Sequence, residues 1–144
     1  MACTISVSLL SEHVDGNIGD DWQYSLEVEV FNPESTGTGR LEVENHKLAP
    51  GVTQVPTNQR TIVIPAGHCD ATATVKLTLT AAEVDLVFSD SNESTSEISV
   101  RCPGEGSRPL TFEREVSVHV EEKPRILGGA ATLIVKVRLV AACE

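Results

Sequence analysis

The sequence is poor in aromatic and basic side chains, and each shortage excludes a class of structure or function. Only 3% of its 144 residues are aromatic, so a hydrophobic core must rest on Val, Leu, Ile and Ala. Lys and Arg number 11 against 21 Asp and Glu, which gives a formal net charge of −10. Phosphate backbones require clustered Lys and Arg, so this balance argues against a nucleic-acid partner. It also argues against binding to an anionic membrane surface unless calcium takes part.

Targeting signals and long apolar runs are also lacking in the sequence. The first residues have no basic region followed by an apolar stretch of signal-peptide length. No segment approaches the ~20 apolar residues that span a bilayer. These features favour a soluble cytoplasmic protein, although a removed signal replaced by an initiator Met would look the same. At 144 residues the chain can bury roughly 70% of its unfolded surface, so we expect one domain over residues 1–144.

Alternation of polar and apolar residues is the dominant pattern that is present. Strand candidates with this pattern lie at residues 5–9, 24–30, 41–43, 62–64, 71–79, 84–88, 98–100, 116–120 and 133–139. Breaks rich in Gly, Pro, Asn and Ser separate them, for example at residues 32–39 and 89–95, and residues 81–84 fit one helical turn. Crossover helices have no room. The pattern predicts an all-β, two-sheet antiparallel β-sandwich of about 8–9 strands, with jelly-roll, immunoglobulin-like or C2-like topology.

An acidic segment between the first two expected strands, residues 11–21, is the strongest candidate site. Calcium prefers about six to eight oxygen ligands on a turning loop, and the segment offers Glu12, Asp15, Asn17, Asp20 and Asp21. It begins like an EF-hand loop but lacks the later oxygen ligands and the glycine that such a loop needs. Asp, Asn and Gly also favour ordinary turns, so a solvated acidic turn is the alternative.

Residues 89–97 form a second polar and acidic segment, which we expect to be a flexible loop. It would add calcium ligands if it lay at the same end of the sandwich as the first. Its Asn92, Glu93 and Ser94 match the acceptor pattern for N-glycosylation. Without a secretion signal we interpret that match as accidental.

Four cysteines lie at positions 3, 69, 102 and 143. Cys3, Cys102 and Cys143 are in phase with neighbouring core residues, which predicts small buried thiols. The alternative is a disulfide, for example between Cys3 and Cys143 if the terminal strands are neighbours. No CxxC pair occurs that would indicate a zinc or redox site.

Recognisable catalytic motifs do not occur in the sequence. His68, Cys69 and Asp70 are adjacent, but neighbours on an extended chain point in opposite directions, so a turn over residues 65–68 is the better interpretation. A hydrolase that uses Cys69 and His68 remains the third hypothesis for function.

The leading hypothesis is a non-enzymatic binding module that recognises a protein or carbohydrate through loops at one end, chiefly residues 12–22. Calcium would assist, and Trp22 and Tyr24 would supply aromatic contacts, although Tyr24 also lies in the apolar phase. The second hypothesis is a structural protein that self-associates through edge strands. Ile134 and Val140 interrupt the polar phase of the last strand, so that strand is either central in its sheet or part of a homo-oligomer contact.

Overall fold

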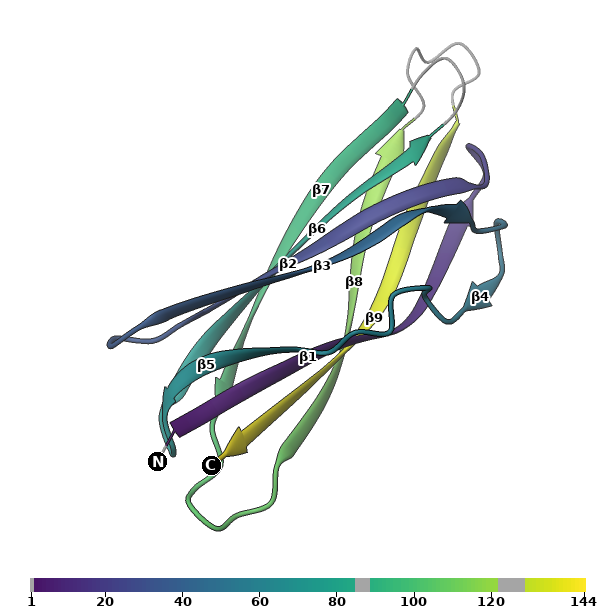
Figure 1. Ribbon diagram of the computed structural model, residues 1–144. Helices are drawn as coiled ribbons and strands as arrows, with labels where there is room; N and C mark the ends of the chain where they lie inside the picture. The colour runs from purple at the N-terminus through teal and green to yellow at the C-terminus, as the bar shows by residue number, and fades with distance from the viewer. Residues whose placement is uncertain (1, 85–88, 122–128) are drawn as a thin grey trace.

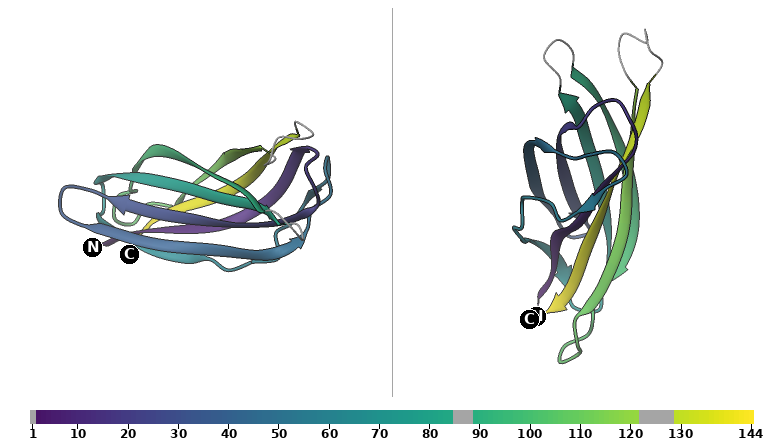
Figure 2. Two further views of the ribbon diagram at one scale, coloured as in Figure 1. Left: turned by 90° about the horizontal axis from the view of Figure 1, so that it is seen from above. Right: turned by 90° about the vertical axis from the view of Figure 1, so that its right-hand side faces the viewer.

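A computed structural model describes residues 2–84, 89–121 and 129–144, which form a two-layer β-sandwich (Figures 1 and 2). The strands in these ranges are β1 (Ala2–Gly16), β2 (Asp21–Phe31), β3 (Thr36–Lys47), β4 (Thr53–Gln54), β5 (Ile62–His68), β6 (Thr72–Val84), β7 (Ser89–Arg101), β8 (Leu110–Glu121) and β9 (Ala130–Cys143). Sheet A has the order β4-β1-β9-β8, and β5 also pairs with β1. Sheet B has the order β3-β2-β6-β7. All these pairs are antiparallel, so the expected all-β antiparallel sandwich is confirmed.

The core between the two sheets is built from the apolar phase of the long strands. Most of its members are Val, Leu, Ile and Ala, as the aromatic-poor composition requires. β9 lies between β1 and β8, and its Leu133 and Leu139 are fully buried on the core side. On its other face Ile134 and Val140 are half-buried. The mixed pattern of this strand therefore reflects its central place in sheet A.

A bulge in β1 decides where the first acidic segment lies. The pairing of β1 with β9 shifts just after Leu9, where one extra residue is inserted. The insertion reverses which positions face inward, so Glu12 and Val14 follow Leu9 into the core. The strand then continues to its end at Gly16. The sequence-based loop over residues 11–21 is therefore mostly strand, and the turn itself spans residues 17–20.

Residues 89–97 are part of strand β7, so the expected flexible loop is wrong. Asn92 Nδ2 donates a hydrogen bond of 2.8 Å to the carbonyl oxygen of His119 on β8. Ser94 Oγ donates one of 2.5 Å to the carbonyl oxygen of Ser117. β7 is the edge of sheet B and β8 the edge of sheet A, so these bonds join the two layers along one side. Side chains that cap a neighbouring backbone must be polar, which hides the strand from an alternation pattern.

Two further sequence-based boundaries are corrected next to β7. Residues 81–84 continue β6 as extended strand and form no helical turn. The separate strand expected at 84–88 begins with Val84, which belongs to β6, and residues 85–88 lie outside the described ranges.

On the opposite side of the sandwich, β3 packs against β5. The expected break over residues 32–39 ends earlier than predicted, because β3 already begins at Thr36. A Cβ atom at Gly37 would lie 2.7 Å from Ile64 Cγ2, and one at Gly39 would lie 2.8 Å from Ile62 Cδ1. The two glycines therefore mark a close approach between the edges of the two sheets, and no turn.

The two ends of the chain lie side by side at one end of the elongated molecule (Figures 1 and 2). The amide of Ala2 donates to the carbonyl oxygen of Glu144 at 3.0 Å, and the amide of Glu144 donates back at 2.9 Å. The described part of the chain contains no helix with the length and apolar character that a membrane crossing needs.

Candidate functional site

The structure separates the five residues assigned to calcium. Glu12 is fully buried between the sheets, whereas Asp15 and Asn17 are exposed near the β1–β2 turn. Asp20 and Asp21 lie at the start of β2. Over residues 2–84, 89–121 and 129–144, no group of three or more His, Cys, Asp or Glu side chains is positioned to hold a metal ion. The calcium hypothesis remains a prediction.

Of the five residues, Asp20 and Asp21 have carboxylates that lie close together, and Lys47 forms an ion pair with each of them. Its Nζ lies 2.8 Å from Asp21 Oδ1 and 3.3 Å from Asp20 Oδ1. The hydrogen bonds that it donates to Asp21 and Asp20 hold the pKa of Lys47 above its usual range. A cation arriving at these two carboxylates would have to displace an ammonium group.

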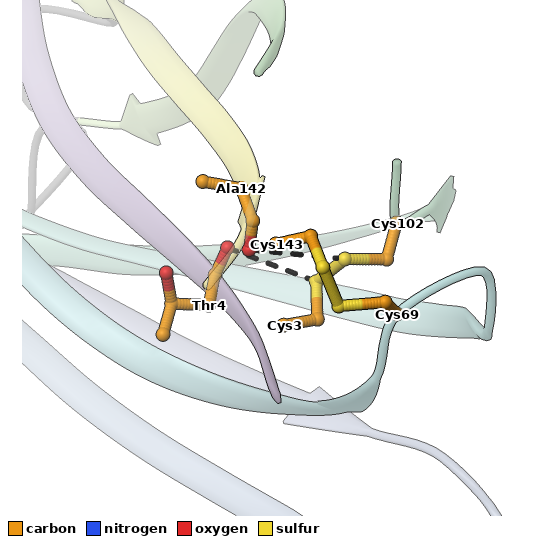
Figure 3. The surroundings of a disulfide bond; sticks show 6 residues. All are labelled: Cys3, Thr4, Cys69, Cys102, Ala142 and Cys143. Carbon is orange, nitrogen blue, oxygen red and sulfur yellow. Dashed lines mark hydrogen bonds between the residues drawn. A yellow bond between two sulfur atoms is a disulfide. The ribbon is translucent and has the colours of Figure 1, made fainter. Parts of the chain in front are cut away.

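All four cysteines form disulfides, so the interpretation as free buried thiols is wrong, whereas the alternative of a disulfide is confirmed with other partners than those named. Disulfides join Cys3 to Cys102 and Cys69 to Cys143, with Cα–Cα distances of 6.1 Å and 5.5 Å. Cys3 and Cys143 are neighbours in the register of β1 and β9, as expected, but they do not bond to each other. The β5–β6 turn and the β7–β8 connection fold over the same end and present two further sulfur atoms there (Figure 3). Four cysteines allow three pairings, and the sequence cannot choose among them.

The disulfide at Cys69 argues against the hypothesis of a hydrolase that uses Cys69 as its nucleophile. The Sγ of Cys69 is bonded to Cys143, so no thiolate nucleophile is present in this form. His68 is exposed and its Nε2 lies 2.9 Å from Glu34 Oε2. The turn expected over residues 65–68 is wrong, because β5 continues to His68 and the turn follows at Cys69 and Asp70, where Asp70 has a φ of 68°.

The outer face of sheet B is hollowed around Arg40, and we call this surface the Arg40 face. Arg40 Nη1 lies 2.9 Å from Glu27 Oε1, and Arg40 Nε lies 2.9 Å from Glu42 Oε1. Three hollows of about 310, 520 and 450 Å³ share this arginine in their walls. The first is lined by Gln23, Tyr24, Ser25, Arg40, Glu42, Val43, Glu44, Thr80, Ala81 and Ala82. The second lies between β3 and the chain that leads to β5, and is lined by Arg40, Glu42, Glu44, Thr57, Asn58 and Arg60.

Strand register explains why this face is hollow there. Ser25 on β2 pairs with Glu42 on β3 and with Thr80 on β6, so small side chains stand in the middle of the sheet with a longer one at its edge. One row further along, Glu27 on β2 pairs with Arg40 on β3, so that longer side chains border the hollow there. The regular threonines of β6 belong to this face, where Thr78 Oγ1 lies 3.3 Å from Thr95 Oγ1 of β7.

The charges of the Arg40 face are mostly negative. The register and the lining of the second hollow place the following charged residues on it: Asp21, Glu27, Glu29, Glu42, Glu44, Glu93 and Glu97, against Arg40, Lys47, Arg60, Lys76 and Arg101. Arg40 is shared between two of these carboxylates. The face therefore attracts positive charge.

A buried polar cluster lies beside this surface, centred on Glu12. The carboxylate of Glu12 is 0% exposed. Its Oε1 accepts a hydrogen bond of 2.7 Å from Tyr24 Oη, and its Oε2 accepts one of 2.8 Å from Gln54 Nε2. His46 Nε2 lies 2.5 Å from the same Oε2. Four strands from both sheets thus meet at one carboxylate, which satisfies the hydrogen-bonding needs of a buried charge.

The aromatic side chains expected at the ligand-binding end are both in the core. Trp22 is fully buried and its Nε1 donates a hydrogen bond of 3.3 Å to the carbonyl oxygen of Gly19. Tyr24 is 4% exposed. Burial first, and then the hydrogen bond to Glu12 and its negative charge, raise the pKa of Tyr24 far above its usual value. The expected aromatic contacts of Trp22 and Tyr24 with a ligand are therefore wrong, and the core alternative for Tyr24 is confirmed.

Sequence reasoning missed Arg40, His46 and Gln54. Glu12 was named only as a loop residue, because its inward position depends on the bulge in the pairing of β1 with β9. Comparison with known proteins adds no assignment, since no protein-family model matches this chain and no curated protein is similar to it.

Proposed function

We propose that this protein is a non-enzymatic binding module that holds its ligand on the Arg40 face. The observation that supports this proposal is the meeting of three hollows at one arginine, on a sheet face whose middle carries small side chains. A regular sheet face is otherwise flat, and ligand sites in proteins are concave.

The charge of the face favours a ligand that is extended and positively charged, such as a basic segment of another protein. Glu29, Glu44 and Glu93 are carboxylates of this face that Arg40 does not contact within salt-bridge distance. Sugar recognition has less support, because the only tryptophan and the only tyrosine of the chain are buried and cannot stack on a ring.

The disulfides support a compartment other than the cytoplasm, which the sequence favoured. Disulfides persist in oxidising compartments and are rare where thiol systems keep cysteines reduced. The two bridges tie the first and last strands to the β7–β8 connection and the β5–β6 turn. We therefore place the module in an oxidising compartment.

A basic peptide provides the direct test. We expect an oligolysine peptide to shift the amide NMR signals of β3, β2 and β6, and an oligoglutamate of the same length to shift none of them. Binding should weaken as salt is added, since exposed charges are screened within about 10 Å at 0.1 M ionic strength.

Two double variants separate a site from a general charge effect. The double variant with Glu42→Gln and Glu44→Gln, both on β3, removes two exposed carboxylates from the Arg40 face. The double variant with Glu113→Gln and Glu115→Gln, both on β8, removes two exposed carboxylates from sheet A, with the same spacing and the same change of charge. We expect the first pair to weaken binding about five- to tenfold and the second to leave it unchanged. Equal losses in both would reject the site.

Self-association through edge strands, the second hypothesis from the sequence, has less support than ligand binding. Asn92 and Ser94 cap carbonyl oxygens of β8, and Asn58 Nδ2 donates a hydrogen bond of 2.7 Å to the carbonyl oxygen of Glu42 on β3. These contacts occupy backbone groups at the edges of both sheets, where an added strand would have to pair.

A further inference from the structure

The contacts of the buried cluster at Glu12 determine where its protons lie. His46 Nδ1 lies 2.8 Å from the carbonyl oxygen of Glu44, which can only accept, so Nδ1 carries a proton. Gln54 Nε2 contacts the carbonyl oxygen of Lys47 at 3.0 Å as well as Glu12, which fixes its amide group as the donor to both.

One further proton must lie between Glu12 Oε2 and His46 Nε2, which are 2.5 Å apart. If His46 carries it, the pair is a carboxylate with an imidazolium, and if Glu12 carries it, both are neutral. In either case the pair has no net charge. Without this proton, an ionised carboxylate would face a nitrogen lone pair, or the imidazole would turn a lone pair toward the carbonyl oxygen of Glu44.

The segment that this pair holds is the strap, residues 48–61, which connects β3 to β5 and contains β4. Its anchors at the near end are Leu48, which is fully buried, and the amide of Gly51, which donates to the carbonyl oxygen of Val14 at 2.8 Å. In its middle Gln54 reaches the buried Glu12 and Asn58 donates to the carbonyl oxygen of Glu42, while Pro56 is buried and Val55 is 65% exposed. The middle of the strap is therefore held by these two polar contacts together with the buried Pro56.

The strap also forms one wall of the Arg40 face. Its Thr57, Asn58 and Arg60 line the second hollow, opposite Glu42 and Glu44 on β3. The backbone of Glu44 in turn accepts the hydrogen bond from His46. The buried pair is thus linked to both walls of the hollow, through the hydrogen bond of His46 to Glu44 and through the hydrogen bond of Gln54 to Glu12.

We propose that the proton shared by Glu12 and His46 is a latch that fixes the strap, so that its loss at raised pH frees the strap and opens the second hollow. The part of this proposal that concerns ligand access rests on the proposed function, whereas the latch itself does not. Other titratable groups in contact with or next to the cluster are His13 on β1, Asp21 and Tyr24 on β2, Glu44 and Lys47 on β3, the buried Glu83 on β6, and Lys136 on β9 beside the apolar Val135 that pairs with Glu12. Of these, Tyr24 keeps its proton and continues to donate, and Lys47 is engaged by Asp21 and Asp20.

The test is an NMR titration of the whole chain without any ligand. We expect a proton on His46 Nδ1, and we expect the amide signals of Thr53, Gln54 and Asn58 to move together with the His46 ring signals as the pH is raised. Hydrogen-exchange protection of those amides should fall about tenfold when the proton is lost. Strap signals that stay fixed over the pH range in which the protein remains folded would overturn the proposal, and so would an unprotonated Nδ1.

Variants identify the source of the response. His46→Gln should abolish the pH response of the strap, and Gln54→Ala, which keeps both residues of the pair, should do the same. His13 also contacts the strap, since its Nδ1 lies 2.9 Å from Thr53 Oγ1, so His13→Gln must retain the response. His119→Gln, at an exposed histidine on β8, is the matched control and should behave as the original protein.

These outcomes are independent of the ligand test. If oligolysine binds and the strap ignores pH, the latch alone is rejected. If the strap responds and no basic peptide binds, the proposed function alone is rejected.

Discussion

Tyr24 is the residue whose chemistry the fold changes most. Its hydroxyl is enclosed between the sheets and donates to the carboxylate of Glu12 at 2.7 Å. Ionising it would place a second negative charge against Glu12 in an enclosed site. Burial and then the interactions with Glu12 therefore raise its pKa, whereas an unfolded tyrosine ionises near pH 10.

This difference predicts how stability depends on alkaline pH. Because the folded pKa is the higher one, the contribution of Tyr24 is complete below about pH 10 and is lost as the pH rises above that value. Tyr24→Phe should flatten this fall, and at neutral pH it should cost about 1–3 kcal/mol because Glu12 loses a donor. Urea unfolding across pH measures both effects. The chain has one tyrosine, so tyrosinate absorbance reports this group alone. Parallel alkaline profiles for the two proteins would contradict the assignment.

At the residue scale, positions set by the local phase of a strand were predictable from the sequence, and positions set by distant partners were not. Tyr24 lies in the apolar phase of its strand, and its place in the core was predictable. Glu12 was assigned to a loop, because the bulge that turns it inward is a property of the pairing of β1 with β9. The partners of Cys3 and Cys143 depend on which connections fold over the same end, which no local pattern encodes.

At the scale of elements, the approach of β3 to β5 can be tested at two glycines. A Cβ at Gly37 would lie 2.7 Å from Ile64 Cγ2 and 3.1 Å from the carbonyl oxygen of Pro65, so backbone would have to move. A Cβ at Gly39 would meet chiefly the end of the Ile62 side chain, at 2.8 Å, which can rotate away.

We therefore expect Gly37→Ala to destabilise the protein by about 1–3 kcal/mol and Gly39→Ala to cost clearly less. Both substitutions lower the entropy of the unfolded chain equally, so their difference isolates the contact with β5. Thermal unfolding of the two variants gives the comparison. A larger loss at Gly39 would mean that the edges of the two sheets do not meet as described.

The β1–β2 turn gives a prediction about calcium. Asp20 and Asp21 are bound by Lys47, and Glu12 is enclosed by Tyr24, His46 and Gln54. We expect millimolar calcium, compared with EDTA, to leave the melting temperature unchanged. Calcium at a hundredfold excess over its dissociation constant would stabilise the fold by roughly 2.7 kcal/mol, a shift on the order of 5–10 °C. A shift of that size would restore the calcium hypothesis.

The strands that the sequence predicted best are those that pair with a strand on each edge and have a regular alternation of polar and apolar residues. β6 and β9 have paired strands on both edges and a continuous apolar phase, and their alternation predicted them. β7 is an edge strand whose inner face caps β8 with Asn92 and Ser94, so its polarity resembled a loop. β4 spans two residues, which is too short for any alternation to show.

At the scale of the whole molecule, the two disulfides close the end where the first and last strands meet. The bridges span 99 and 74 residues of sequence, so the entropy that they remove from the unfolded chain differs by only about 0.3 kcal/mol. Burial distinguishes them: Cys3 and Cys102 are in the core, whereas Cys69 and Cys143 are half-buried.

This contrast predicts the order in which a dithiol reductant opens them. The Cys69–Cys143 bridge should be reduced first, because a thiolate must reach a sulfur atom to attack it. The bridge between Cys3 and Cys102 should open only when the end of the sandwich loosens. Alkylation during mild reduction, followed by peptide mass spectrometry, records the order. Replacing either pair with alanine should lower stability by about 2–5 kcal/mol, with the larger loss for Cys3 and Cys102, whose sulfur atoms also fill the core. Simultaneous reduction of both bridges would show that the two pairs are equally accessible and would contradict the difference in burial.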